Sequence, residues 1–196
     1  MKQQLIQVLK VILVWLEDKE KAQETNLPVL QPPKVLPVTK MSTSGIEFLK
    51  KLEGYRAKPY FCSANQRTIG YGHAIKNGEV FEFLNEDQAD KLLRRDVETF
   101  EKVVSKHNLN LTQNQFDALV CLIFNIGQTQ FEKSQTLKNL KSGNYVQGLI
   151  EWAGFNKERK AGKKGELVAS VGLTNRRTAE IALFNKEMPE VGSQAA

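Results

Sequence analysis

Apolar and polar positions in the first 26 residues repeat with the period of a helix. Across residues 5–16 the apolar side chains fall on one helical face, while Gln3, Gln7 and Lys10 share the other. This pattern predicts an amphipathic helix that is too short for an ordinary membrane span. Two interpretations stay open: membrane association or export, as by a signal-peptide core without a clean cleavage site, and a plain docking helix.

A proline-rich stretch separates this segment from the rest of the chain. Residues 27–38 hold four prolines, which exclude a regular helix or a central strand and predict a stiff, extended linker. The hydrophobic periodicity of a folded domain follows it. We therefore predict an N-terminal helix over residues 1–26, a linker over 27–42, a domain over 43–187 and a flexible tail over 188–196.

The first helix of the predicted domain ends on an acidic residue. Ser44 and Glu47 form a capping-box pattern, and Gly54 is a natural helix stop. Glu53 lies four residues after Leu49, so it ends the helix on a face that is otherwise apolar. Partial desolvation favours the protonated carboxyl, which makes Glu53 a candidate proton donor. A solvated glutamate at a frayed helix end is the simpler alternative.

A predicted β-hairpin follows this helix directly. Two short strands, over residues 58–62 and 67–71, flank a turn of four residues. Such a hairpin gathers Cys62, Thr68 and His73 beside the end of the first predicted helix. The stretch therefore brings a carboxyl, a thiol, a hydroxyl and an imidazole together, as in an active site.

Two longer helices are predicted after the hairpin. Asn85 is placed to cap an amphipathic helix over residues 86–104. Thr112 and Gln115 form a capping-box pattern in front of residues 113–126, whose side chains are apolar nearly all round. This second helix is therefore expected to be buried.

Composition and cysteine usage narrow the chemistry. The formal net charge of +6 favours anionic surfaces such as nucleic acid, anionic lipid or an acidic wall polymer, without specifying one. Cys62 and Cys121 are too few for a disulfide scaffold and show no metal-ligand spacing with His73 or His107. Cys121 lies among apolar helix positions, so we interpret it as a small buried hydrophobe rather than a disulfide partner.

Several motifs together resemble one enzyme family. Glu53, eight residues, Cys62, five residues and Thr68, followed by IGYGH, resemble the catalytic signature of the phage-type lysozymes, the endolysins of glycoside hydrolase family twenty-four. In that family the middle position is Asp or, in a minority, Cys. The resemblance continues over residues 43–187 through FEKSQTLKNLKSGNY, LIEWAGF and GLTNRRTAEIALF. It implies a mainly helical α+β, lysozyme-like fold with a small hairpin lobe, a larger helical lobe and a substrate cleft between them.

The resemblance also implies an activity and roles for individual residues. The enzyme would hydrolyse the β-1,4 bonds between N-acetylmuramic acid and N-acetylglucosamine in peptidoglycan, for host lysis, with no cofactor and no metal. Glu53 would be the acid, Arg176 would hold its geometry, and Thr68 would orient water for an inverting reaction. Asn125 would face the cleft, and His73 is interpreted as a structural residue that pairs with an acidic side chain.

The expected setting combines this family resemblance with the pattern of the N-terminal segment, which lies outside the resemblance. A monomer made in the host cytoplasm would act on the wall without binding nucleic acid, and residues 5–16 would supply an inner-membrane tether or an export signal. The basic run over residues 157–164 is interpreted as a solvated loop, with steering toward anionic wall polymers as the functional alternative. Trp152 is expected in the core.

Cys62 is the departure that leaves other functions open. A thiolate there would polarise water or attack the sugar, but an unperturbed thiol, with a pKa of about 8.5, is mostly protonated near neutral pH. Its competence would depend on neighbours such as Arg67 or His73. One alternative is a wall amidase or peptidase with Cys62 as nucleophile and His73 as base. Another is a wall-binding protein that has lost catalysis.

Overall fold

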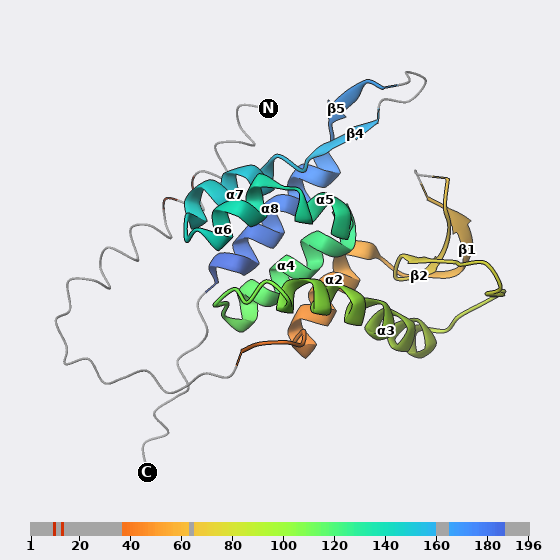
Figure 1. Ribbon diagram of the computed structural model, residues 1–196. Coiled ribbons are helices and arrows are strands. Elements are labelled where there is room, and N and C mark those ends of the chain that lie inside the picture. The colour runs from red at the N-terminus through yellow and green to blue at the C-terminus, as the bar shows by residue number, and fades with distance from the viewer. Residues whose placement is uncertain (1–9, 11–12, 14–36, 63–64, 160–164, 187–196) are drawn as a thin grey trace, which may run out of the picture.

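The protein folds into a small sheet lobe and a larger helical lobe, joined by one long helix (Figure 1). The computed structural model describes residues 37–62, 65–159 and 165–186, with the single positions 10 and 13. Most of the linker and the C-terminal tail lie outside these residues, as does the predicted helix over residues 5–16 apart from those two positions. Among the helices described, none is long and apolar enough to cross a membrane.

The helix that carries Glu53, α2 (Thr43–Glu53), begins earlier than the sequence predicts. Its N-cap is Ser42, which accepts a hydrogen bond from the Gly45 backbone at 2.9 Å, so the capping box predicted from Ser44 and Glu47 is wrong. Asp117 decides between the two serines, because it accepts hydrogen bonds from both the backbone and the hydroxyl of Ser42. The helix stops at Gly54, as predicted, where φ is 69°.

The chain enters this domain through contacts with two buried carboxylates. Glu101 accepts a hydrogen bond from the Met41 backbone at 2.8 Å and forms an ion pair with Lys40 at 2.9 Å. Asp117 accepts a hydrogen bond from the Ser42 backbone at 3.0 Å. The position and direction of the entering chain are therefore set by side chains from α3 (Glu86–Ser105) and α4 (Gln113–Ile126).

The small lobe is a three-stranded antiparallel sheet. Its strands, in spatial order, are β1 (Arg56–Phe61), β2 (Arg67–Gly70) and β3 (His73–Ala74). Tyr60 pairs with Thr68 across β1 and β2, so the predicted hairpin is confirmed with shifted ends. Strand β2 stops before Tyr71 because Gly70 adopts φ of 65°, a left-handed conformation.

The two long helices match their predicted positions. α3 is capped by Asn85 and α4 by Thr112, and each start has the reciprocal hydrogen bonds of a capping box. Residues 116–123 of α4 are all buried, so the helix forms the centre of the large lobe. Its burial follows from a sequence that offers no polar face to solvent along these two turns.

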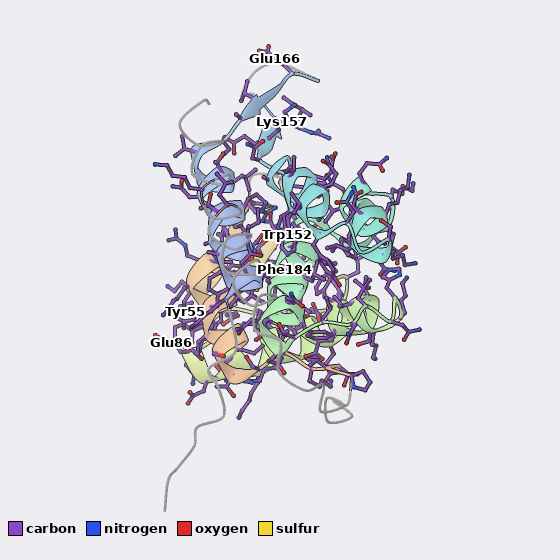
Figure 2. All side chains as sticks on the ribbon, turned by 90° about the vertical axis from the view of Figure 1, so that its left-hand side faces the viewer. Tyr55, Glu86, Trp152, Lys157, Glu166 and Phe184 are labelled. Atoms are coloured by element: carbon purple, nitrogen blue, oxygen red, sulfur yellow. The ribbon has the colours of Figure 1, made fainter. Side chains whose placement is uncertain are left out.

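Four further helices complete the large lobe, and α5 and α8 pack directly on α4: α5 (Gln128–Glu132), α6 (Gln135–Lys141), α7 (Tyr145–Ala153) and α8 (Val171–Asn185). Trp152 is fully buried, as predicted, and its ring meets Phe184 edge to face in the interior (Figure 2). The mainly helical fold with a small antiparallel sheet confirms the predicted fold class.

A second, two-stranded sheet projects from the large lobe. Strand β4 (Lys157–Arg159) pairs antiparallel with β5 (Leu167–Ala169), so the loop predicted from residue 157 onward is wrong at its start. Figure 2 shows Lys157 and Glu166 at the end of the molecule far from Tyr55. The side chains of these strands are almost all exposed, so the sequence has no alternation of buried and exposed positions from which the strands could be predicted. Only the backbone pairing defines them.

Candidate active site

Glu53 is held by an arginine from the far end of the chain. Arg176, on α8, donates a hydrogen bond from Nη2 to Glu53 Oε1 at 2.7 Å. Their side chains are only 9% and 16% exposed, so the pair is largely shielded from water. Burial lowers the pKa of Arg176, but attraction to Glu53 and Glu180 outweighs this and raises the pKa above its ordinary value. Arg176 is therefore a fixed cation beside the candidate acid.

The other carboxylate oxygen of Glu53 faces a bare backbone turn. Gly72 lies between β2 and β3 with φ of 85°, and a Cβ at this position would lie 3.2 Å from Glu53 Oε2 and 3.5 Å from Phe124 Cε1. A cavity of about 270 Å³, lined by Gly72, His73, Asp96 and Phe124 among others, opens here between the small lobe, α3 and α4. Glycine thus keeps the space beside Oε2 clear.

One backbone carbonyl links Cys62 and Thr68. Gln66 O accepts a hydrogen bond from the Cys62 backbone N–H at 3.0 Å and another from Thr68 Oγ1 at 2.9 Å. The hydroxyl proton of Thr68 is therefore already committed, and its oxygen can still accept a hydrogen bond from water. Thr68 is only 4% exposed, which fixes the direction of that acceptor.

Tyr60 connects the two halves of the candidate site electrostatically. It pairs with Thr68 across the sheet. Burial raises the pKa of Tyr60, and the charges of Glu53 and Cys62 raise it further. The phenol therefore lies within electrostatic reach of both the acid at the end of α2 and the thiol that follows β1.

Both ring nitrogens of His73 have carboxylate partners. Nδ1 lies 2.6 Å from Asp96 Oδ2, and Nε2 lies 2.8 Å from Glu79 Oε2. The Lys76 backbone N–H and His73 both lower the pKa of Glu79. With two carboxylates on its nitrogens, the ring ties β3 to α3 and is not placed to take a proton from Cys62. This geometry argues against a Cys62–His73 pair of the amidase type.

A buried ionic network behind Arg176 was missed by the sequence reasoning. Glu180 is fully buried and contacts three donors: Arg176 Nε at 3.0 Å, Arg177 Nη2 at 2.9 Å and Trp152 Nε1 at 3.1 Å. Arg177 Nε also lies 2.8 Å from Glu180 Oε2, although its N–H does not point at that oxygen. The four-residue spacing from Arg176 to Glu180 on one helix could have suggested this ion pair, although not its burial.

Asn125 lies on the exposed end of α4 and is oriented by this network. Its Oδ1 accepts a hydrogen bond from Arg177 Nη2 at 3.0 Å, and Arg177 also donates to Phe155 O at 3.3 Å. A larger hollow, about 710 Å³, lies beyond it in the large lobe, lined by Ile126, Phe155 and residues of α5, α6 and α7. Phe124 lines the smaller cavity and Ile126 the larger hollow, so both reach the C-terminal end of α4, where Asn125 lies.

The two cysteines have different environments. No disulfide joins Cys62 to Cys121, both of which belong to the described residues. Cys121 is fully buried, and burial raises the pKa of its thiol well above the ordinary value. The prediction that Cys121 is a small core residue is confirmed. Within the described part of the chain, no group of three or more His, Cys, Asp or Glu side chains is arranged to hold a metal ion.

Comparison with known proteins agrees with this arrangement. Residues 50–180 match the family model for phage lysozyme. An endolysin of Acyrthosiphon pisum secondary endosymbiont phage 1 is 38% identical over 145 residues, which cover 74% of this chain and 97% of that relative.

Solved structures show the same fold. The muramidase domain of SpmX from Asticaccaulis excentricus superposes with a TM-score of 0.69 at 30% identity, covering 76% of this chain and 99% of that one. The endolysin from Escherichia coli O157:H7 phage FAHEc1 gives 0.67 at 35% identity, covering 74% and 92%. Sequence and fold agree over most of the chain, and the chain belongs to the phage lysozyme family.

Proposed function

We propose that Glu53, Cys62 and Thr68 form the catalytic set of this lysozyme. The enzyme is an endolysin, a muramidase that hydrolyses the β-1,4 bonds between N-acetylmuramic acid and N-acetylglucosamine in peptidoglycan and so lyses the host cell. The observation that carries the proposed site is the contact of 2.7 Å between Arg176 and Glu53, whose other oxygen lies beside Gly72 in the wall of a cavity.

Glu53 supplies the proton. Hydrolysis of a glycosidic bond needs an acid that protonates the leaving oxygen. Arg176 holds Oε1, so the proton is carried on Oε2, the oxygen beside Gly72 and the cavity. The bare turn at Gly72 lets the glycosidic oxygen approach to hydrogen-bonding distance.

Thr68 and Cys62 serve the attacking water. Thr68 accepts a hydrogen bond from this water, because its own proton is donated to Gln66 O. Cys62 takes the place of the second carboxylate: as the thiolate, it accepts the proton that this water loses as it attacks. Attack from the face opposite Glu53 inverts the anomeric carbon. We expect the first product seen by NMR to be the α-anomer, and a covalent sugar adduct on Cys62 in a slow-substrate trap would overturn this scheme.

Replacement of Glu53 by glutamine tests the function. The variant keeps the shape of the side chain and loses the proton, so release of reducing ends from purified peptidoglycan should fall by about a thousandfold or more. Glu47→Gln, an exposed glutamate on the same helix, is the matched control and should retain activity. Release of new amines instead of reducing ends would indicate an amidase. Wall binding without clearing by the wild type would indicate a binding module.

We further propose that residues 5–16 bring the enzyme to its site of action, by an inner-membrane tether or by export. The support is the amphipathic pattern of this segment, with the basic residue Lys10 on its polar face. The enzyme acts on the cell wall, works as a monomer and binds no nucleic acid in this scheme. Deletion of residues 2–26 should leave activity on purified walls unchanged and stop lysis from within the cell. Lysis at the wild-type rate would refute the proposal.

A further inference from the structure

Glu180 on α8 stands between the two arginines that serve the cleft. It is fully buried, and the shared oxygen Oε1 accepts hydrogen bonds from both Arg176 Nε and Arg177 Nη2. Oε2 accepts a hydrogen bond from Trp152 Nε1. The carboxylate thus has no surface toward substrate, and anything that it does for the reaction must pass through the arginines.

We propose that Glu180 is a positioning residue that divides the charge of Arg176 between two carboxylates and thereby sets how firmly Glu53 keeps its proton. The inference rests on the proposed role of Glu53 as the acid. The charges of Glu53, Arg176, Glu180 and Arg177 alternate in sign along a chain of contacts between 2.7 and 3.0 Å. Arg176 therefore forms hydrogen bonds with two carboxylates, Glu53 and Glu180, at once.

The sign of the effect follows from this alternation. An arginine paired only with Glu53 would favour the ionised carboxyl, whereas the negative charge of Glu180 favours the protonated one. Tyr60 from β1, Cys121 from α4 and Arg177 from α8 also lie within electrostatic reach of Glu53. The Cys121 thiol and the Tyr60 phenol are neutral near pH 7. The balance between the protonated and the ionised form of Glu53 is therefore set by the two arginines and Glu180.

The same carboxylate also orients a polar side chain at the C-terminal end of α4. Glu180 holds Arg177, which is 1% exposed, and Arg177 in turn holds Asn125 Oδ1 and Phe155 O. Because the carbonyl end of the Asn125 amide is taken, its NH₂ group is left to donate outward. One buried anion therefore aligns both the acid and a hydrogen-bond donor on the surface beside it.

Two substitutions with opposite signs test the inference. Glu180→Gln keeps the shape and removes the anion, so the alkaline limb of the kcat/KM profile on soluble glycan strands should move to lower pH by about one unit. Arg177→Met removes a cation, so the same limb should move to higher pH. Arg177→Met should also raise KM about tenfold, because Asn125 loses its anchor.

Glu101→Gln is the matched control. Glu101 is another buried glutamate, 5% exposed, and it binds the entering chain rather than the site. Its replacement should lower the melting temperature and leave the pH profile unchanged. If Glu180→Gln does not fold, the alkaline limb of the kcat/KM profile of Arg177→Met still tests the inference, because it should move to higher pH.

Titration of the Glu53 carboxyl carbon by NMR in the free enzyme separates this inference from the catalytic role. The midpoint should fall in Glu180→Gln and rise in Arg177→Met. Midpoints that stay at the wild-type value, or move in the same direction in both variants, would show that Glu180 is only a structural residue. An active Glu53→Gln enzyme would remove the acid role and would leave this measurement of charge division valid.

Discussion

Gly72→Ala perturbs the space beside the proposed acid with a single methyl group. The residue has φ of 85°, a conformation that costs an alanine about 1–2 kcal/mol in the free energy of unfolding. The added Cβ would lie 3.2 Å from Glu53 Oε2 and 3.5 Å from Phe124 Cε1, so both neighbours must give way. The variant is therefore expected to fold with a modest loss of stability.

The effect on activity should be larger than the effect on stability. The glycosidic oxygen must come within about 2.6–3.2 Å of Oε2 to receive the proton. The methyl group occupies the same side of Glu53, and a misplacement of about 1 Å is enough for a loss of about 100-fold in kcat/KM. We expect a loss of that size, measured on soluble glycan strands, with urea unfolding measured in parallel.

Gly78→Ala supplies the control for backbone strain. Its φ of 88° nearly equals that of Gly72, and within the described chain an added Cβ there meets no atom closer than 4 Å. Both variants should lose similar stability, and only Gly72→Ala should lose activity. Equal kcat/KM values for the two variants would refute the argument that the bare turn is needed for access to Oε2.

Two further outcomes follow from the site. Glu79→Gln should reduce stability at neutral pH. The folded protein lowers the pKa of Glu79 from 4.5, so the difference in the free energy of unfolding between wild type and variant is present above pH 4.5. This difference disappears as pH falls through the lower pKa of the folded state. A difference that persists in stronger acid would contradict this prediction. Iodoacetamide at mildly alkaline pH should add one label, at Cys62, and inactivate the enzyme, because burial protects Cys121; a labelled Cys121 in folded, active protein by mass mapping would disprove this.

Local signals made the two long helices predictable. Asn85 and Thr112 cap their helices through residues three positions ahead, so the information lies within one helical turn. The start of α2 was not predictable in this way. Ser42 rather than Ser44 is the N-cap of α2 because Ser42 binds Asp117, a residue 75 positions away along the chain. No short-range sequence pattern predicts that contact.

The candidate site shows the same division. Glu53, Cys62 and Thr68 lie within 16 residues of one another, so a hairpin prediction could gather them. Arg176 entered only through family resemblance, since nothing local directs a helical arginine to a carboxylate 123 residues earlier. Glu180 and Arg177 were missed because the polar residues of α8 that turn inward are selected by packing against α4 and α7, which a single sequence does not reveal.

The way in which the chain enters the domain has a geometric consequence for the intact protein. Glu101 and Asp117 fix residues 40–42 at the start of α2, and Glu53 stands at the end of the same helix. A helix of 11 residues is about 16 Å long, so the point of attachment and the acid are separated by a rigid rod of that length. A partner or surface that binds the upstream segment therefore attaches at the N-terminus of α2, one helix length away from the proposed acid Glu53 at its C-terminus.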